Sequence, residues 1–301
     1  MSSTTDTLQK TYSSFADGLT DEKLDDFLKD SEAIMARPTA LLLSQAGIDA
    51  STTKPLKLLD NACGTGVVGS QLQRVMNKSV LERSSILCGD VNQSFLDILR
   101  RRVHKEDWVS VRVETIDAQD SKLQKDSFTH VTISHGMHVI PNPDMVLEVA
   151  DTLRILQPGG IFAFSTMNKD NAAWVPDVRS AFATLPFEAA LPDPFPMASN
   201  GHLEWTDPKG IEEKLLKYGF EDVRVEVIQH TQQIQNAEKF VGMFAMMINW
   251  LAQSYWTAEQ LEKYLSSVSE HVAEHLRKKH GGNGWELMWT MNLVTCRTSL
   301  S

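Results

Sequence analysis

Short apolar runs alternate with amphipathic stretches along the central part of the chain. Five of the runs have the length and composition of buried strands: residues 57–60, 85–90, 111–116, 129–134 and 161–164. Helical patterns separate them, and the alternation extends from about Leu56 to Met167. Strands that alternate with helices in this way are typical of parallel βαβ units. The pattern therefore predicts an α/β fold built around a largely parallel sheet.

Helical patterns precede this central part. Apolar spacing predicts helices around Asp21 to Phe27 and Ala33 to Gln45. The second is expected to break near Pro38, because proline removes a backbone donor and clashes with the preceding turn. We interpret residues 1–50 as an amino-terminal helical lid over the sheet.

Proline concentrates after the fifth strand. Six of the eleven prolines fall between Pro176 and Pro208, so we expect no regular element in that stretch. A helix is predicted to begin after Trp205 and to end at Gly219, where glycine stops it. Residues 220–228 then resume as a strand.

Residues 236–280 predict two further helices, inserted before a final strand near residues 288–296. The first of them is apolar on every side and rich in methionine, which fits buried packing and equally fits an adaptable small-molecule pocket. Both interpretations stay open. The sequence thus predicts a core formed by residues 51–235 and 285–301, with residues 236–284 as an inserted helical cap. The candidate substrate-binding residues are Trp174, Phe195, Met243, Met247 and Trp250.

Charge and cysteine content narrow the class of protein. The formal net charge of the 301 residues is −10 and no basic block occurs, which argues against nucleic acid or an anionic membrane as partner. The three cysteines form no close pair and no metal-type spacing. Residues 1–10 lack an apolar signal core, and no run of about 18 apolar residues occurs. We therefore expect a soluble cytoplasmic protein, and the oligomeric state stays open.

A glycine turn after the first strand is the strongest chemical signal. Glycine permits positive φ and leaves no Cβ in the way, so Gly64 and Gly66 let the backbone approach a ligand at the start of the next helix. Together with Gly69 they also satisfy the dinucleotide-binding spacing. Asp60, however, stands at the strand end four residues earlier. A carboxylate there would repel a pyrophosphate and suits a cationic ligand with amine and hydroxyl donors.

The order Asp60-x-Ala62-x-Gly64-x-Gly66 after a strand resembles the first motif of class I S-adenosylmethionine-dependent methyltransferases. This resemblance implies a Rossmann-like, seven-stranded sheet with helices on both faces, and S-adenosylmethionine as cofactor. Asp90 ends the second strand at the spacing of a ribose ligand, and Asp117 follows the third strand where the family binds the adenine amino group. The cofactor-binding candidates are Asp60, Ala62, Gly64, Gly66, Asp90, Val91, Asp117, Ala118 and Ser134.

Two narrower resemblances concern the acceptor. Residues 135–144 and 153–160 are similar to methyltransferases of ubiquinone and menaquinone biosynthesis. Almost the whole chain is similar to fungal secondary-metabolite methyltransferases, which include the gliotoxin thiol methyltransferase. The likeness implies a small, fairly apolar natural product as acceptor. His135 and His138 replace the aromatic, amide-bearing loop associated with the thiol enzyme, so we expect a hydroxyl acceptor rather than an amine or a thiol.

His135 and His138 lie in the loop after the fourth strand and are the catalytic candidates. Imidazole titrates near neutrality, so either residue can serve as a base if the acceptor must lose a proton. Each can equally be a hydrogen-bond donor or a packed side chain. Two histidines three residues apart, without carboxylates nearby, make an incomplete metal site, so no metal is expected.

Two other classes of function use parts of the same pattern. A nicotinamide oxidoreductase explains the glycines, but it leaves Asp60 and Asp117 without a role. A non-catalytic relative that binds the cofactor and regulates a partner is also compatible with the fold, because a fold does not fix a function. The acceptor loop and the apolar cap favour the enzyme.

Overall fold

The computed structural model describes residues 10–11, 14, 21–147 and 152–300. Its centre is a seven-stranded sheet of order β3-β2-β1-β4-β5-β7-β6, in which β7 is antiparallel to both of its neighbours. The strands are β1 (Lys57–Asn61), β2 (Ser85–Asp90), β3 (Val111–Thr115), β4 (Phe128–Ser134), β5 (Leu156–Met167), β6 (Glu221–Ile234) and β7 (Trp285–Arg297). The predicted Rossmann-like, seven-stranded fold is confirmed.

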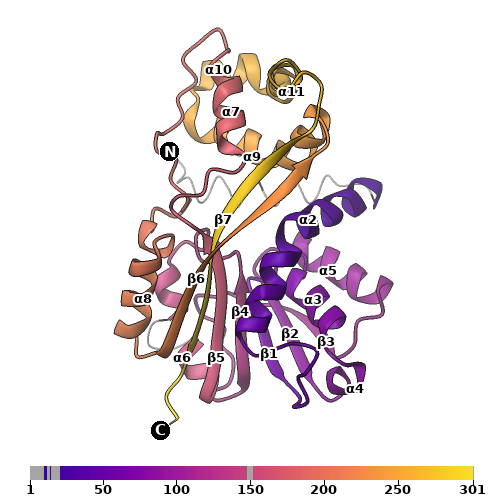
Figure 1. Cartoon of the computed structure of the whole chain (residues 1–301), viewed down its shortest axis with the longest axis vertical. Helices are drawn as coiled ribbons and strands as arrows, with labels where there is room; N and C mark the ends of the chain where they lie inside the picture. The colour runs from indigo at the N-terminus through magenta and orange to yellow at the C-terminus, as the bar shows by residue number, and fades with distance from the viewer. Residues whose placement is uncertain (1–9, 12–13, 15–20, 148–151, 301) are drawn as a thin grey trace.

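Helices cover both faces of the sheet because neighbouring strand residues point to opposite sides. Leu58 packs into a core formed with α2, α3 and α5, and Leu59 packs into the opposite core under α8. Figure 1 shows these two groups of helices on either side of the strands. The helices are α2 (Asp21–Gln45), α3 (Val67–Val75), α4 (Lys78–Leu81), α5 (Gln93–Lys105), α6 (Thr152–Ile155), α7 (Val175–Phe182), α8 (Pro208–Lys217), α9 (Ala237–Tyr255), α10 (Ala258–Tyr264) and α11 (Val268–Lys279).

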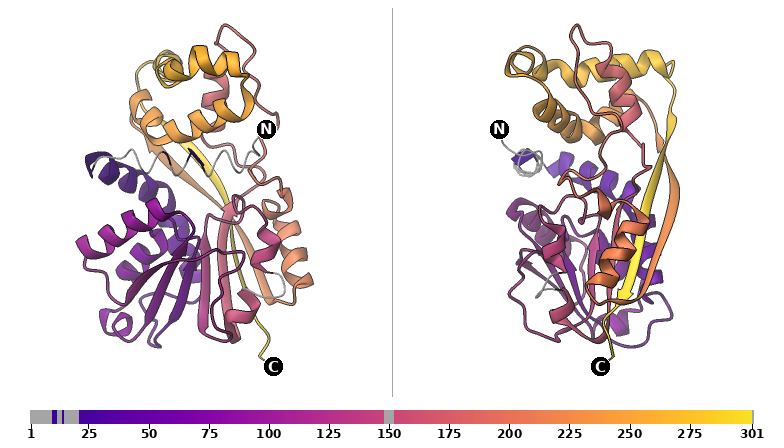
Figure 2. Two further views of the ribbon diagram at one scale, coloured as in Figure 1. Left: turned by 180° about the vertical axis from the view of Figure 1, so that it is seen from behind. Right: turned by 90° about the vertical axis from the view of Figure 1, so that its left-hand side faces the viewer.

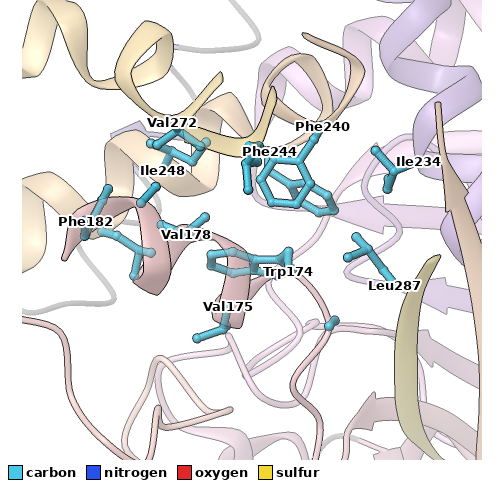
Figure 3. Packing of buried hydrophobic residues seen from close by; sticks show 14 of the residues in the cluster. Trp174, Val175, Val178, Phe182, Ile234, Phe240, Phe244, Ile248, Val272 and Leu287 are labelled. Carbon is cyan, nitrogen blue, oxygen red and sulfur yellow. The ribbon is translucent and has the colours of Figure 1, made fainter. Parts of the chain in front are cut away.

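A second layer stands beyond one end of the sheet. β6 and β7 are 14 and 13 residues long and remain paired up to Ile234 and Trp285, and α9, α10 and α11 connect their far ends. With α7 these helices form what we call the upper lobe, which both views of Figure 2 show above the sheet. Its core is aromatic and includes Trp174, Phe240 and Phe244 (Figure 3).

The predicted break at Pro38 is wrong, because α2 runs through it as one helix. Proline inside a helix costs roughly 3 kcal/mol. The flanking side chains offset this, since Leu42 and Leu43 are fully buried and Met35 nearly so. Burial of each such side chain contributes about 1.5–3 kcal/mol, so tertiary packing outweighs the local penalty.

The prediction of no regular element after Pro176 is also wrong. Pro176 lies in the first turn of α7, where its missing N–H is not required and its fixed φ suits the helix. The strand predicted to end near residue 228 continues to Ile234.

The stretch predicted as two helices contains three, α9, α10 and α11. α9 ends before Thr257, whose side chain begins α10 in a reciprocal capping box with Gln260. Such a box satisfies two free backbone donors and so starts a new helix within an otherwise helical stretch.

None of the described helices is both long and apolar enough to cross a membrane. The part of the predicted lid before residue 21, apart from residues 10, 11 and 14, lies outside the described residues. The division into lid, core and cap stays a prediction.

Candidate active site

The turn after β1 has the backbone geometry that its glycines permit. φ is +53° at Gly64 and +86° at Gly66, and α3 begins directly after Gly66. A Cβ at Gly66 would lie 2.4 Å from Leu99, so a larger residue does not fit there. A Cβ at Gly64 would meet nothing within 4 Å. Gly66 thus packs against α5, whereas Gly64 borders open space that a ligand can occupy. Ala62 shares the positive φ, at +51°.

Asp60 is fully buried at the end of β1. Its Oδ1 accepts a hydrogen bond of 2.9 Å from the Thr132 hydroxyl, but Oδ2 has no hydrogen-bond partner among the described residues. Burial raises the pKa of Asp60 to about 7, and the charge of Asp90 adds to the rise. A buried carboxylate oxygen without a partner is costly unless a donor completes it. A ligand ammonium group fits this position.

Asp90 ends β2 beside the glycine turn. Its Oδ2 accepts from the backbone N–H of Gly64 at 2.8 Å, and its Oδ1 accepts from that of Asn92 at 2.9 Å. Burial raises the pKa of Asp90, and these two hydrogen bonds oppose the rise. Each carboxylate oxygen keeps acceptor capacity for a diol. Val91, which follows, is 55% exposed and offers an apolar surface next to the carboxylate.

Asp117 follows β3 and continues the same row. Its side chain is exposed and accepts from the backbone N–H of Gln119 at 2.9 Å, while the adjacent Ala118 is buried. β1, β2 and β3 are neighbours in the sheet, and neighbouring strands lie about 4.8 Å apart. Asp60 pairs with Cys88 and Asp90 pairs with Thr115, so the three acids form a staggered row that advances toward the same edge of the sheet. An elongated ligand with an amine, a diol and a ring amino group matches that row.

The loop after β4 brings the two predicted histidines together. The rings of His135 and His138 meet edge to face with centroids 4.5 Å apart, and Nδ1 of His138 lies 3.2 Å from the Thr166 hydroxyl. His135 has a φ of +63°, and its backbone N–H donates to the Ser165 hydroxyl at 2.9 Å. Its Nδ1 is buried and has no partner among the described residues.

Both imidazoles are neutral near pH 7. Burial lowers the pKa of His135 to about 4, and nearby His230 contributes to the same shift. Burial, together with His135, also places the pKa of His138 well below its usual value. A neutral ring retains one nitrogen lone pair, so each histidine can accept a proton or a hydrogen bond. Among the described residues, no group of three or more His, Cys, Asp or Glu side chains is arranged to hold a metal ion.

Three of the substrate-binding candidates, Trp174, Phe195 and Trp250, contact one another or Phe244 in the aromatic core of the upper lobe. Trp174 stacks on Phe244 at 5.8 Å, and Phe195 contacts both Trp174 and Trp250 edge-on at 6.2 Å. Trp174 and Trp250 are almost fully buried, so in this structure they are packing residues. Met243 and Met247 are half-buried against the same cluster. A role of these five side chains in binding a substrate stays a prediction.

Helix α2 contributes to the site through residues that the sequence did not indicate. Thr39 contacts the Ser134 hydroxyl at 3.1 Å, and the backbone oxygen of Ile34 accepts from His230 on β6 at 3.1 Å. No local pattern marks these residues, because their roles arise only where α2 docks on the sheet.

Behind the glycine turn, Glu32 of α2 pairs with the buried guanidinium of Arg102, which also donates to the backbone oxygen of Thr65 at 3.3 Å. Glu32 further accepts from the Ser70 hydroxyl at 2.6 Å. α2 is therefore attached both to the site and to the turn that begins α3.

Comparison with known proteins agrees with this geometry. Residues 45–190 match the model of the ubiE/COQ5 methyltransferase family. The chain is 28% identical over 243 residues to methyltransferase tpcH of Aspergillus fumigatus, covering 81% of this chain and 84% of that protein. It is 27% identical to the acetylaranotin bis-thiomethyltransferase of Aspergillus terreus, covering 81% and 82%.

The fold is shared with phosphoethanolamine N-methyltransferase 2 of Haemonchus contortus, solved in complex with S-adenosyl-L-methionine. The TM-score is 0.52 at 16% identity, with 87% of this chain and 52% of that chain covered.

The chain is therefore an S-adenosylmethionine-dependent methyltransferase, and over residues 45–190 it is similar to the ubiE/COQ5 family. The resemblance inferred from the sequence and the predicted cofactor are confirmed. The residues of the site fit that cofactor: Asp60 offers an unpaired acceptor for an ammonium group, and Asp90 keeps acceptor capacity for a ribose diol. A dinucleotide, which the glycine spacing also allowed, is not supported.

Proposed function

We propose that this enzyme methylates a hydroxyl group of a small, fairly apolar natural product in fungal secondary metabolism. The observation that carries the proposal is the pair of neutral imidazoles of His135 and His138, in contact with each other in the loop after β4. They lie at the same edge of the sheet as Asp60, and the aromatic upper lobe stands beyond that edge.

Nine residues at that edge are proposed to hold the cofactor. Asp60 would take the ammonium group at Oδ2, Asp90 the ribose hydroxyls, and Asp117 the adenine amino group. Gly64 would leave room for the methionine part. The remaining five are Ala62, Gly66, Val91, Ala118 and Ser134. When bound, S-adenosylmethionine supplies an electrophilic methyl group on a sulfonium.

The low pKa of His135 decides when the acceptor loses its proton. A phenol has a pKa of about 10, and moving its proton to an imidazole of pKa about 4 would cost on the order of 8 kcal/mol. Full deprotonation before methyl transfer is therefore unfavourable. As the oxygen gains the methyl group its O–H becomes strongly acidic, and Nδ1 of His135 can then take the proton. His138 and Thr166 orient the ring next to it.

A thiol acceptor is the second candidate. It is favoured by one observation, the 27% identity to a protein named as an acetylaranotin bis-thiomethyltransferase. A thiol loses its proton near pH 8.5 and needs less help from a base than a hydroxyl does. The two histidines would then act as hydrogen-bonding groups only.

Product analysis separates these proposals. The purified enzyme is incubated with S-adenosylmethionine that carries an isotope-labelled methyl group and with fungal extract, followed by matched phenol, thiol and amine panels. We expect products heavier by one labelled methyl group, with that group on oxygen. Labelled S-methyl products without any O-methyl product would overturn the hydroxyl proposal and leave the enzyme class intact.

A further inference from the structure

His230 lies on β6, far along the chain from the predicted acceptor loop. Its side chain is 6% exposed and stacks on Trp289 of β7, with centroids 6.4 Å apart and an interplanar angle of 12°. The two residues are direct partners in the pairing of β6 with β7. Residues 230, 232 and 234 are buried whereas 229, 231 and 233 are exposed, so His230 points to the inner face of the strand.

The hydrogen bonds of His230 determine its tautomer. Nε2 lies 3.1 Å from the backbone oxygen of Ile34 on α2. A carbonyl oxygen only accepts, so Nε2 must carry the proton and donate it. Burial lowers the pKa of His230, and the nearby charge of Arg37 lowers it further, so the ring is neutral at pH 7. A neutral ring protonated at Nε2 has a bare lone pair at Nδ1.

This bare Nδ1 is buried and has no hydrogen-bond partner among the described residues. The same holds for Nδ1 of His135, whose pKa His230 influences. An acceptor atom left unpaired in an apolar surrounding costs free energy unless a donor completes it. No charged side chain of the described structure hydrogen-bonds either ring. Nδ1 of His230 is thus an acceptor atom that a donor from a bound molecule can complete.

We propose that His230 is a specificity-determining residue of the acceptor pocket, and that its Nδ1 accepts a hydrogen bond from an O–H, S–H or N–H group of the acceptor. This proposal rests on the proposed methylation of a small apolar molecule and deepens it. Trp289 and α2 hold the ring, since one side stacks on the indole and the N–H is bound to Ile34. Acceptors that present an ether or a carbon at this point would leave Nδ1 unpaired and bind less tightly.

The test uses phenol and anisole as probes, because they share a ring and differ by one donor. Long-range proton–nitrogen NMR of the native protein with S-adenosylhomocysteine reports the protonation of each ring nitrogen of His230. We expect Nε2 protonated and Nδ1 bare, and a shift of the Nδ1 resonance when phenol is added but not when anisole is added. A protonated Nδ1, or shifts that are equal or absent for the two probes, would overturn the proposal.

Matched variants assign the effect to one nitrogen. His230→Gln keeps an N–H for the Ile34 oxygen and has no atom at Nδ1, whereas His230→Asn places an amide oxygen near Nδ1. Loss of one hydrogen bond to a buried group predicts that the native preference for phenol over anisole, roughly 5- to 150-fold, vanishes in the glutamine variant. The asparagine variant should recover part of it. A preference that persists in His230→Gln would contradict the assignment.

Calorimetry with S-adenosylhomocysteine serves as the control, because the cofactor affinity should not change in either variant. A structural role alone would lower the binding of cofactor, phenol and anisole together. Failure of the proposed function has a different signature, since native protein that shows the phenol-specific shift but never methylates a hydroxyl would refute only the hydroxyl acceptor.

Discussion

The carboxylates of Asp60 and Asp90 stand at the ends of the adjacent strands β1 and β2, and the charge of Asp90 adds to burial in raising the pKa of Asp60 to about 7. Two acids in this arrangement destabilise the empty site and favour a cation. The arrangement lowers the stability of the free protein and raises its affinity for the cofactor, as is common in preorganised binding sites.

Asp60→Asn should stabilise the protein without cofactor at pH 8. The native pKa of Asp60 is raised, so its charged form costs stability, and this cost grows as the pH rises from about 4 to about 7. The full cost is on the order of 4 kcal/mol, and the neutral amide avoids most of it. Denaturant unfolding of both proteins at pH 4, 6 and 8 measures the difference. A variant less stable than the native protein at pH 8 would show that the carboxylate is paired.

Cofactor binding should release a proton below pH 7. An ammonium group on Oδ2 of Asp60 would lower the raised pKa, so the carboxyl group must lose its proton on binding. The affinity should then increase with pH, by at most about tenfold per unit, and level off above pH 7. Calorimetry at pH 6 in buffers of different ionisation enthalpy counts the protons. Their number should fall in Asp60→Asn, and equal heats in all buffers would refute the pairing.

The variants His135→Ala and His138→Ala should show which of the two histidines takes the proton of the acceptor. If the acceptor is a hydroxyl, loss of the true base lowers single-turnover methylation by roughly 100- to 10,000-fold while cofactor affinity remains unchanged. Because the pKa of His135 is about 4, the native rate should not fall through protonation of this ring until the pH nears 4. A native ionisation near pH 6.5 that disappears in one variant would show that the acceptor or cofactor restores the usual pKa.

Glu32→Ala should lower the free energy of local unfolding of α2. Although burial acts to raise it, hydrogen bonds from Ser70 and Arg102 keep the pKa of Glu32 below its usual value, so the carboxylate is charged and paired. Its removal takes one acceptor from the buried guanidinium of Arg102, which keeps Glu106 and the Thr65 oxygen, so the cost is roughly 1.5–3 kcal/mol. Hydrogen exchange in α2 should accelerate more than in β1 or β4. Glu259→Ala, at an exposed position on α10, is the control and should leave exchange in α2 unchanged.

The sequence predicted those parts of the fold that depend on local chemistry. Gly66 and Asp60 are recognisable because the turn after β1 requires a positive φ and its ligand requires an acid, both within a few residues of a buried strand. The five parallel strands are likewise local, since each is an apolar run bounded by polar residues.

Features that depend on distant docking could not be predicted. α2 continues through Pro38 because Leu42 and Leu43 are fully buried, and nothing within the helix reveals that burial. His230 gains its role only from the Ile34 oxygen, 196 positions away in the chain. The start of α10 at Thr257 is different, because the Thr257–Gln260 capping box is a local signal that the sequence itself contains.

The most direct test is a crystal structure of the protein with S-adenosylhomocysteine. The account predicts the amino group of the ligand within hydrogen-bonding distance of Oδ2 of Asp60, and the ribose hydroxyls on Asp90. It also predicts that the sulfur faces the rings of His135 and His138. A ligand bound elsewhere, or a sulfur turned away from both histidines, would contradict the account.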